Sequence, residues 1–107
     1  MVESSIITLV KRYLSVLPEY GIHARKAVLF GSFARGDTHE WSDIDLLVIA
    51  PEFDAAQTID FGKQLWRATA IADDRIEPIP CGEREWETQG GRPILEIARR
   101  EGIVIAA

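Results

Sequence analysis

Two short apolar stretches, separated by a connection of only 12 residues, constrain this chain more than any other feature. The first is KAVLF at residues 26–30, which ends at Gly31, and the second is DIDLLVIA at residues 43–50. Both are typical of β-strands in length and composition. A connection with room for little more than one helical turn favours antiparallel pairing. The end of the first strand and the start of the second are therefore expected to meet at one edge of a sheet.

Carboxylate side chains and unpaired backbone amides would lie close together at that edge. Alternation along the second strand places Asp43 and Asp45 on one face, about 6–7 Å apart. Carboxylate oxygens suit hard divalent cations, whereas the Ser32 hydroxyl and the amides of the turn suit an anion. A side chain at Gly31 would keep a triphosphate away from the backbone. The pattern indicates a site for a divalent metal and a phosphate.

Each half of this pattern also has a purely structural interpretation. A Gly-Ser pair at a strand end is common, and Asp-x-Asp can be a solvated cap. The two aspartates, however, share their face with Leu47 and Ile49. Unpaired charge beside apolar residues is costly unless a metal or hydrogen bonds compensate it. The combination therefore favours a functional site.

The rest of the chain alternates helical and extended patterns. Apolar spacing predicts a first helix after Ser4, a helix over 53–72, a strand over 75–80, a polar helix fragment and turn over 82–92, a helix over 93–101 and a strand over 103–106. Two prolines in the third strand favour a short strand or an edge position. We expect one α/β (α+β) domain spanning residues 1–107, with a small mixed sheet.

Composition excludes several classes of function. A net charge of −5 and a pI near 5.0 argue against binding to long nucleic acids, which requires clustered Lys and Arg. A single cysteine excludes an internal disulfide, and two histidines leave no Cys/His set for structural zinc. From the acidic residue at position 3 and the short apolar run that follows, we expect neither a signal peptide nor a membrane span at the beginning of the chain. We expect a cytoplasmic protein with no membrane association.

The string GSFARGDTHEWSDIDLLV resembles the signature of the minimal nucleotidyltransferases of the DNA polymerase β superfamily. Gly31 and Ser32 are followed, after ten residues, by Asp43-x-Asp45, and the Ala-Arg-Gly step at 34–36 also matches. The resemblance covers essentially the whole chain. It implies the polymerase β-like fold, with core strand order 1-2-3 flanked by helices.

The resemblance also implies a third carboxylate on the third strand. Glu77 is the acidic residue of that predicted strand, where many relatives have aspartate, so it departs from the pattern by one methylene. Asp43, Asp45 and Glu77 are then the catalytic and metal-binding set. The implied cofactor is Mg²⁺ in a two-metal site, with Mn²⁺ as an alternative.

The nucleotide in this family would be ATP, held by Gly31, Ser32 and Arg35. No spacing argument assigns a role to Lys63. Trp41, within the motif loop, is a further candidate for contact with the ligand.

The implied activity is transfer of AMP from ATP to a hydroxyl, specifically a tyrosine of a HEPN-family toxin. The chain would then be the antitoxin of a type VII-like pair, in a hetero-oligomer or as a homodimer. Two alternatives remain open. One is a catalytically weak or inactive antitoxin that neutralises its toxin by binding. The glutamate at position 77 favours this alternative, whereas the intact motif residues Gly31, Ser32, Asp43 and Asp45 argue against it. The other is nucleotidyl transfer to a small molecule of the aminoglycoside type.

Overall fold

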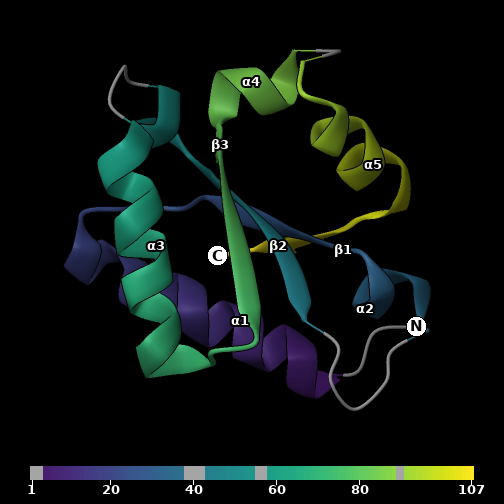
Figure 1. Ribbon diagram of the computed structural model, residues 1–107, viewed down its shortest axis with the longest axis horizontal. Coiled ribbons are helices and arrows are strands. Elements are labelled where there is room, and N and C mark those ends of the chain that lie inside the picture. The colour runs from purple at the N-terminus through teal and green to yellow at the C-terminus, as the bar shows by residue number, and fades with distance from the viewer. Residues whose placement is uncertain (1–3, 38–42, 55–57, 89–90) are drawn as a thin grey trace.

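The strands of the computed structural model form one mixed sheet with the order β3-β2-β1-β4 (Figure 1). The structure describes residues 4–37, 43–54, 58–88 and 91–107. The strands are β1 (Lys26–Phe30), β2 (Ile44–Ala50), β3 (Ile76–Gly82) and β4 (Ile103–Ala106). β1 is antiparallel to β2 and β4, whereas β2 and β3 are parallel. This arrangement confirms the expected mixed sheet with core strand order 1-2-3.

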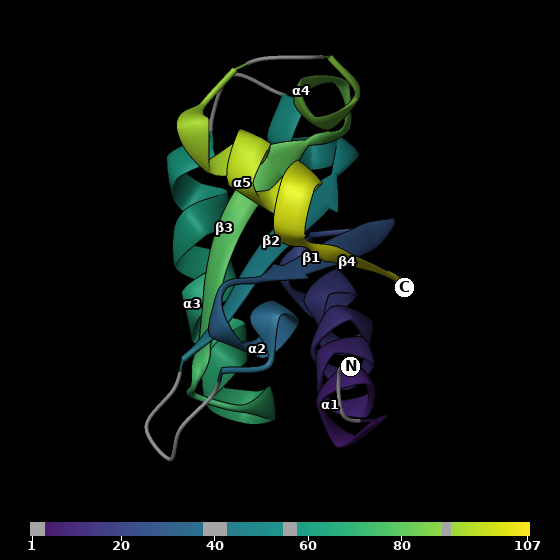
Figure 2. The ribbon, with the colours of Figure 1, turned by 90° about the vertical axis from the view of Figure 1, so that its right-hand side faces the viewer.

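Helices cover both faces of the sheet (Figures 1 and 2). The helical segments are α1 (Ser4–Val16), η1 (Leu17–Tyr20), α2 (Ser32–Arg35), η2 (Pro51–Asp54), α3 (Thr58–Ala72), α4 (Glu83–Glu87) and α5 (Pro93–Glu101). α1 and α3 pack on one face, and α4 and α5 pack on the other. Among the described residues, no helix has the length and apolar character needed to cross a membrane.

Alternation along β2 divides its side chains between two apolar cores. Ile44, Leu46 and Val48 belong to the core with α1 and α3, whereas Leu47 and Ile49 belong to the core with α5. All five are fully buried. A central strand covered on both faces needs apolar residues at nearly every position. The face that carries Asp45 is therefore the one on which α4 and α5 pack.

β3 is an edge strand, as its two prolines predicted. The Ile44 N–H donates to the Arg75 carbonyl at 2.9 Å, which directs the backbone groups of odd-numbered β3 residues toward β2. Pro78 and Pro80 therefore face the free edge, where a missing N–H breaks no ladder bond. The Pro80 carbonyl accepts a hydrogen bond from Arg92 Nη2 at 2.8 Å. This edge is closed to a further strand.

Two predicted boundaries were wrong. The helix expected from residue 53 begins at Thr58, because Phe53 and Asp54 belong to η2 and residues 55–57 lie outside the described part. The Asp54 carboxylate accepts a hydrogen bond from the Arg84 N–H at 3.3 Å, so it caps the start of α4 instead. The third strand also continues to Gly82. The capping partner lies 30 residues away, which no local pattern reveals.

Candidate active site

Three acidic residues meet where β2 and β3 begin, and we call Asp43, Asp45 and Glu77 the carboxylate edge. Asp45 lies opposite Phe30 of β1 and opposite Glu77 of β3 in the sheet register. Asp43 directly precedes β2. The Glu77 carboxyl lies within hydrogen-bonding reach of both aspartate carboxyls. The structure thus brings together the three carboxylates that the sequence singled out.

Gly31 lies directly against the Asp45 carboxylate. Its φ of 75° and ψ of −151° are adopted almost exclusively by glycine. A Cβ at this position would lie 3.0 Å from Asp45 Cγ and would collide with Asp45 Oδ2. The sequence suggested that glycine is needed to let a phosphate approach. The structure adds a second reason, because only glycine leaves room for the carboxylate beside the turn.

The turn after Gly31 presents amides next to the carboxylate edge. The first bonds of α2 run from the Ala34 and Arg35 N–H groups to the Gly31 carbonyl, both at 3.1 Å. The amides of Ser32 and residue 33 come before these bonds, as at the start of any helix. Amides in this position are suited to an anion. Arg35 lies at the end of the same turn, and its Nε is 3.2 Å from Asp37 Oδ2.

The electrostatics of the carboxylate edge oppose the accumulation of negative charge. Burial raises the pKa of Asp45, and the charge of Asp43 raises it further, while a hydrogen bond with Glu77 and the charge of Arg35 act in the opposite direction. Burial also raises the pKa of Glu77, and the two neighbouring aspartates add to that effect. Like charges held close together raise each other's pKa. A cation at this edge would relieve the repulsion.

The donor set fits a divalent metal in its chemistry. Three carboxylates from adjacent strands are the hard oxygen ligands that Mg²⁺ and Mn²⁺ take. Their side chains are not preorganised as a shell, because no group of three or more His, Cys, Asp or Glu in the described residues is placed to hold a metal ion. Asp43 and Glu77 are both exposed, so their side chains are free to change rotamer. Binding a metal would therefore require the carboxylates to reorient.

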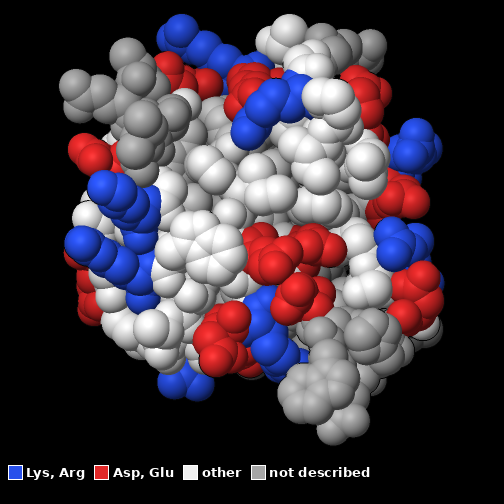
Figure 3. All heavy atoms as spheres, viewed as in Figure 1, with Lys and Arg blue, Asp and Glu red and all other residues white. Residues whose placement is uncertain are grey.

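Arg75 is a second cation near the carboxylate edge that the sequence analysis did not consider. It precedes β3, and its carbonyl accepts the hydrogen bond from the first residue of β2. Its guanidinium is held by Asp73 through contacts of 3.1 and 3.0 Å. Figure 3 shows acidic side chains gathered in the middle of the face along which β3 runs, with basic ones directly beside them. Arg75 lies two residues before Glu77, and this proximity in the sequence is the signal that could have identified it.

Other residues considered from the sequence lie elsewhere. Lys63 is exposed on α3. Trp66, on the same helix, is 52% exposed. Trp41 lies outside the described residues. His23 is exposed, and its Nδ1 lies 2.8 Å from Glu52 Oε2.

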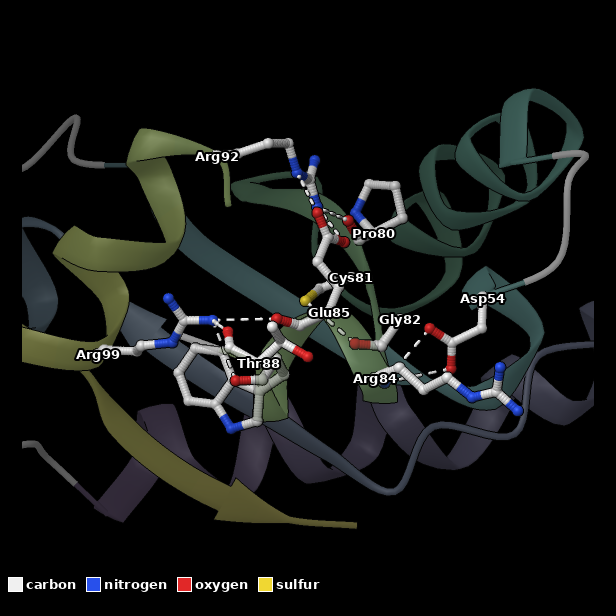
Figure 4. A network of polar contacts seen from close by, with 10 residues as sticks. Asp54, Pro80, Cys81, Gly82, Arg84, Glu85, Thr88, Arg92 and Arg99 are labelled. Atoms are coloured by element: carbon white, nitrogen blue, oxygen red, sulfur yellow. Dashed lines mark hydrogen bonds and ion pairs between the residues drawn. The ribbon is translucent and has the colours of Figure 1, made fainter. Parts of the chain in front are cut away.

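The opposite end of β3 is consolidated by arginines (Figure 4). Arg92 pairs with Glu85 at 2.8 and 2.9 Å, and Arg99 donates to the carbonyls of Glu85, Trp86 and Thr88. These bonds satisfy carbonyls that a helix end leaves unpaired. The network joins α4 to α5.

Cys81 lies in this network and is fully buried. Burial raises the pKa of its thiol to about 12. The reactive form of cysteine is the thiolate, so this side chain stays protonated and unreactive. Two cavities of about 230 and 300 Å³ open at this same end of the sheet, the first beside Lys26 and Trp86 and the second beside Pro80 and Arg92. Neither is lined by a residue of the carboxylate edge.

Comparison with solved structures shows the same fold in two proteins. One is a protein from Sulfolobus solfataricus assigned as a nucleotidyltransferase, with a TM-score of 0.63 and 20% identity over 92% of this chain and 77% of that one. The other is a toxin–antitoxin structure with AMP-PNP, with a TM-score of 0.63 and 17% identity over 92% of this chain and 71% of that one. Curated proteins gave no match.

Comparison with family models identifies the chain more directly. The model of the nucleotidyltransferase domain matches residues 10–89. This range contains β1, α2, β2 and β3, and with them the glycine turn and all three residues of the carboxylate edge. The chain belongs to the nucleotidyltransferase domain family.

Proposed function

We propose that this chain transfers AMP from ATP to a hydroxyl group on a partner protein. The observation that carries the proposal is the carboxylate edge, in which Asp45 lies opposite Glu77 and against the turn at Gly31. Carboxylates for metal and amides for phosphate thereby lie side by side. Membership of the nucleotidyltransferase domain family supports the same reaction class.

Asp43, Asp45 and Glu77 would hold Mg²⁺ or Mn²⁺. When bound, such an ion neutralises phosphate charge and lowers the pKa of the attacking hydroxyl. Without a cation, three carboxylates would repel a triphosphate. Burial raises the pKa values of Asp45 and Glu77, and the charge of neighbouring aspartates adds to this effect.

The glycine turn would hold the triphosphate. The amides of Ser32 and residue 33 precede the first bonds of α2 and can donate to phosphate oxygens. The Ser32 hydroxyl adds a donor, and Arg35 supplies positive charge close to Asp45. Gly31 leaves the backbone open to close approach.

The reaction would proceed by attack of the acceptor hydroxyl oxygen on the α-phosphorus of ATP. A new O–P bond forms, the bond between the α-phosphorus and the bridging oxygen breaks, and pyrophosphate leaves with the bond electrons. The hydroxyl proton passes to Glu77 or Asp45.

The acceptor we propose is a tyrosine hydroxyl of a HEPN-family toxin, with this chain as the antitoxin. The structural likeness to a toxin–antitoxin protein with AMP-PNP supports a protein partner and an adenine nucleotide. The exposure of Asp43 and Glu77 supports it too, because exposed groups are accessible to a residue on another protein's surface. An antitoxin that acts by binding alone is the competing function.

Incubation with α-labelled ATP, Mg²⁺ and the protein encoded by the neighbouring gene tests the proposal. We expect label on the neighbour, and none when γ-labelled ATP replaces it, because the γ-phosphate leaves with pyrophosphate. The assay would be repeated with Mn²⁺ and with the other nucleoside triphosphates. Mass spectrometry of the labelled peptide then identifies the modified hydroxyl.

Matched variants separate the site from the fold. Asp45→Asn and Glu77→Gln should abolish transfer, whereas Asp60→Asn, an exposed carboxylate on α3, should leave it unchanged. Full transfer by Asp45→Asn would refute the site assignment. Absence of transfer with every nucleotide and metal, together with a stable complex with the neighbour, would establish the binding-only function instead.

A further inference from the structure

Arg75 lies on the side of the carboxylate edge that is remote from the glycine turn. The sheet register pairs Ile44 with Ile76, so one residue earlier Arg75 is level with Asp43. The Ile44 N–H donates to the Arg75 carbonyl at 2.9 Å, which fixes this level. Because β2 lies between β1 and β3, Arg75 and the turn at Gly31 flank the carboxylates from opposite sides.

The Arg75 guanidinium is held by one carboxylate and keeps other donors available. Asp73 accepts hydrogen bonds from Arg75 Nε at 3.1 Å and from Nη2 at 3.0 Å, and its Oδ1 also accepts from the Arg75 backbone N–H at 2.8 Å. The Nη1 group has no hydrogen bond or ion pair with another residue in the described part of the chain. The Asp73 side chain is 19% exposed, whereas that of Arg75 is 46% exposed. The pair therefore fixes the orientation of the guanidinium and leaves Nη1 for another partner.

Neutralisation of the carboxylate edge does not account for this arrangement. Asp43 and Glu77 are both exposed and lie close to Arg75 in the sheet register. Figure 3 shows basic side chains directly beside the gathered acidic ones. An arginine that served only to neutralise this edge would pair with one of its members, whereas Arg75 pairs with Asp73. Its guanidinium is thus available to a group that arrives from outside the chain.

The direction of the proposed reaction places the acceptor on the same side as Arg75. Nucleotidyl transfer is an in-line displacement, in which the attacking and leaving oxygens lie on opposite sides of the α-phosphorus. With the β- and γ-phosphates at the turn after Gly31, pyrophosphate leaves toward the side of β1. The acceptor hydroxyl must then approach from the side of β3, where Arg75 lies.

We propose that Arg75 binds the acceptor residue, by donation from Nη1 to the attacking oxygen, and so helps to determine which hydroxyl is modified. The inference rests on the proposed nucleotidyl transfer. Arginine keeps its charge throughout the physiological pH range and can stabilise the negative charge that develops on the oxygen as its proton leaves. Asp73 is then a positioning residue, because it holds the guanidinium in place.

Arg75→Gln removes the guanidinium and leaves the backbone carbonyl that Ile44 binds. In the assay with α-labelled ATP and the protein encoded by the neighbouring gene, kcat/KM for that acceptor should fall about 10–100-fold, as expected for a lost hydrogen bond to a charged group. The affinity for α,β-methylene-ATP with Mg²⁺, measured by calorimetry, should not change. Arg35→Gln, on the opposite side, should weaken nucleotide binding instead. Arg12→Gln changes an exposed arginine on α1, which packs on the other face of the sheet, and should alter neither quantity.

Asp73→Asn tests the orientation of the guanidinium. The asparagine Oδ1 can still accept from the Arg75 backbone N–H, so the turn is kept while the ion pair is lost. The value of kcat/KM for the acceptor should fall, and adding Arg75→Gln to this variant should reduce it no further than Arg75→Gln alone. Losses that multiply would show that Asp73 acts apart from Arg75 and would overturn its positioning role.

Binding of the neighbouring protein provides a readout that needs no transfer. In the presence of Mg²⁺ and α,β-methylene-ATP, it should bind Arg75→Gln at least about 10-fold more weakly than the wild type. A wild type that binds the neighbour but transfers no label would refute the proposed reaction, and this comparison would still decide whether Arg75 contacts the partner. Equal kcat/KM and equal affinity in the wild type and Arg75→Gln would overturn the inference and leave the proposed function standing. A neighbour that neither binds nor accepts label would overturn both.

Discussion

Gly31→Ala is expected to destabilise the chain by about 3 kcal/mol, because two costs fall on one residue. The backbone at φ 75° and ψ −151° costs a non-glycine residue about 1–3 kcal/mol. The new Cβ would also collide with the Asp45 carboxylate, whose Cγ would be 3.0 Å away. Displacing that side chain from its rotamer adds about 0.5–1.5 kcal/mol.

Urea unfolding followed by circular dichroism measures this cost against two matched glycines. Gly36 has φ 80° and ψ 16°, and a Cβ there would meet nothing within 4 Å, so Gly36→Ala should cost about 1–2 kcal/mol. Gly62 lies within α3 and also has open space, so Gly62→Ala should gain about 0.5–1 kcal/mol. The urea concentration at the unfolding midpoint should be highest for Gly62→Ala, followed by the wild type, then Gly36→Ala, and lowest for Gly31→Ala.

A double-mutant cycle isolates the collision with the carboxylate. In an Asp45→Ala background the Oδ2 and Cγ atoms are absent, so Gly31→Ala should retain only the backbone cost of about 1–3 kcal/mol. The reasoning is refuted if Gly31→Ala costs no more than Gly36→Ala, or if its cost is the same in both backgrounds.

Three further outcomes are expected. The folded state raises the pKa values of Asp45 and Glu77, so the stability that their protonated forms contribute is present below about pH 4 and is lost as the pH rises through the raised values. Glu77→Gln should therefore become more stable relative to the wild type between about pH 4 and pH 7, as measured by urea unfolding. A difference in stability that stays constant over this range would contradict the argument. Arg99→Met should lower the free energy of unfolding by about 3 kcal/mol, because the hydrogen bonds to three carbonyls are lost. The control Arg100→Met changes an exposed residue and should alter stability by less than about 0.5 kcal/mol in the same assay. Equal losses of stability in the two variants would count against the role of Arg99. Asp54→Ala should cost about 1 kcal/mol in thermal unfolding through loss of the α4 cap, and an unchanged midpoint would argue against it.

Local patterns in the sequence were sufficient for the arrangement of β1 and β2. Alternation fixed which face carries Asp45, and the short connection fixed the antiparallel pairing that places Gly31 beside it. Prolines at alternate positions of β3 predicted an edge strand, because proline cannot donate to a ladder. These features depend on backbone geometry within a few residues, so the sequence carries them directly.

Tertiary structure decided the features that join distant segments. The sequence alone nominated Glu77 through family resemblance, and the register with Asp45 brought it to the carboxylate edge. The Asp54 carboxylate caps a helix that begins about 30 residues further along the chain, and Arg99 of α5 donates a hydrogen bond to the Thr88 carbonyl at the end of α4. The free edge of β4 likewise becomes visible only when the strand order is known. Such contacts depend on how elements pack, and the chain encodes that packing in its whole apolar pattern and not in any local motif.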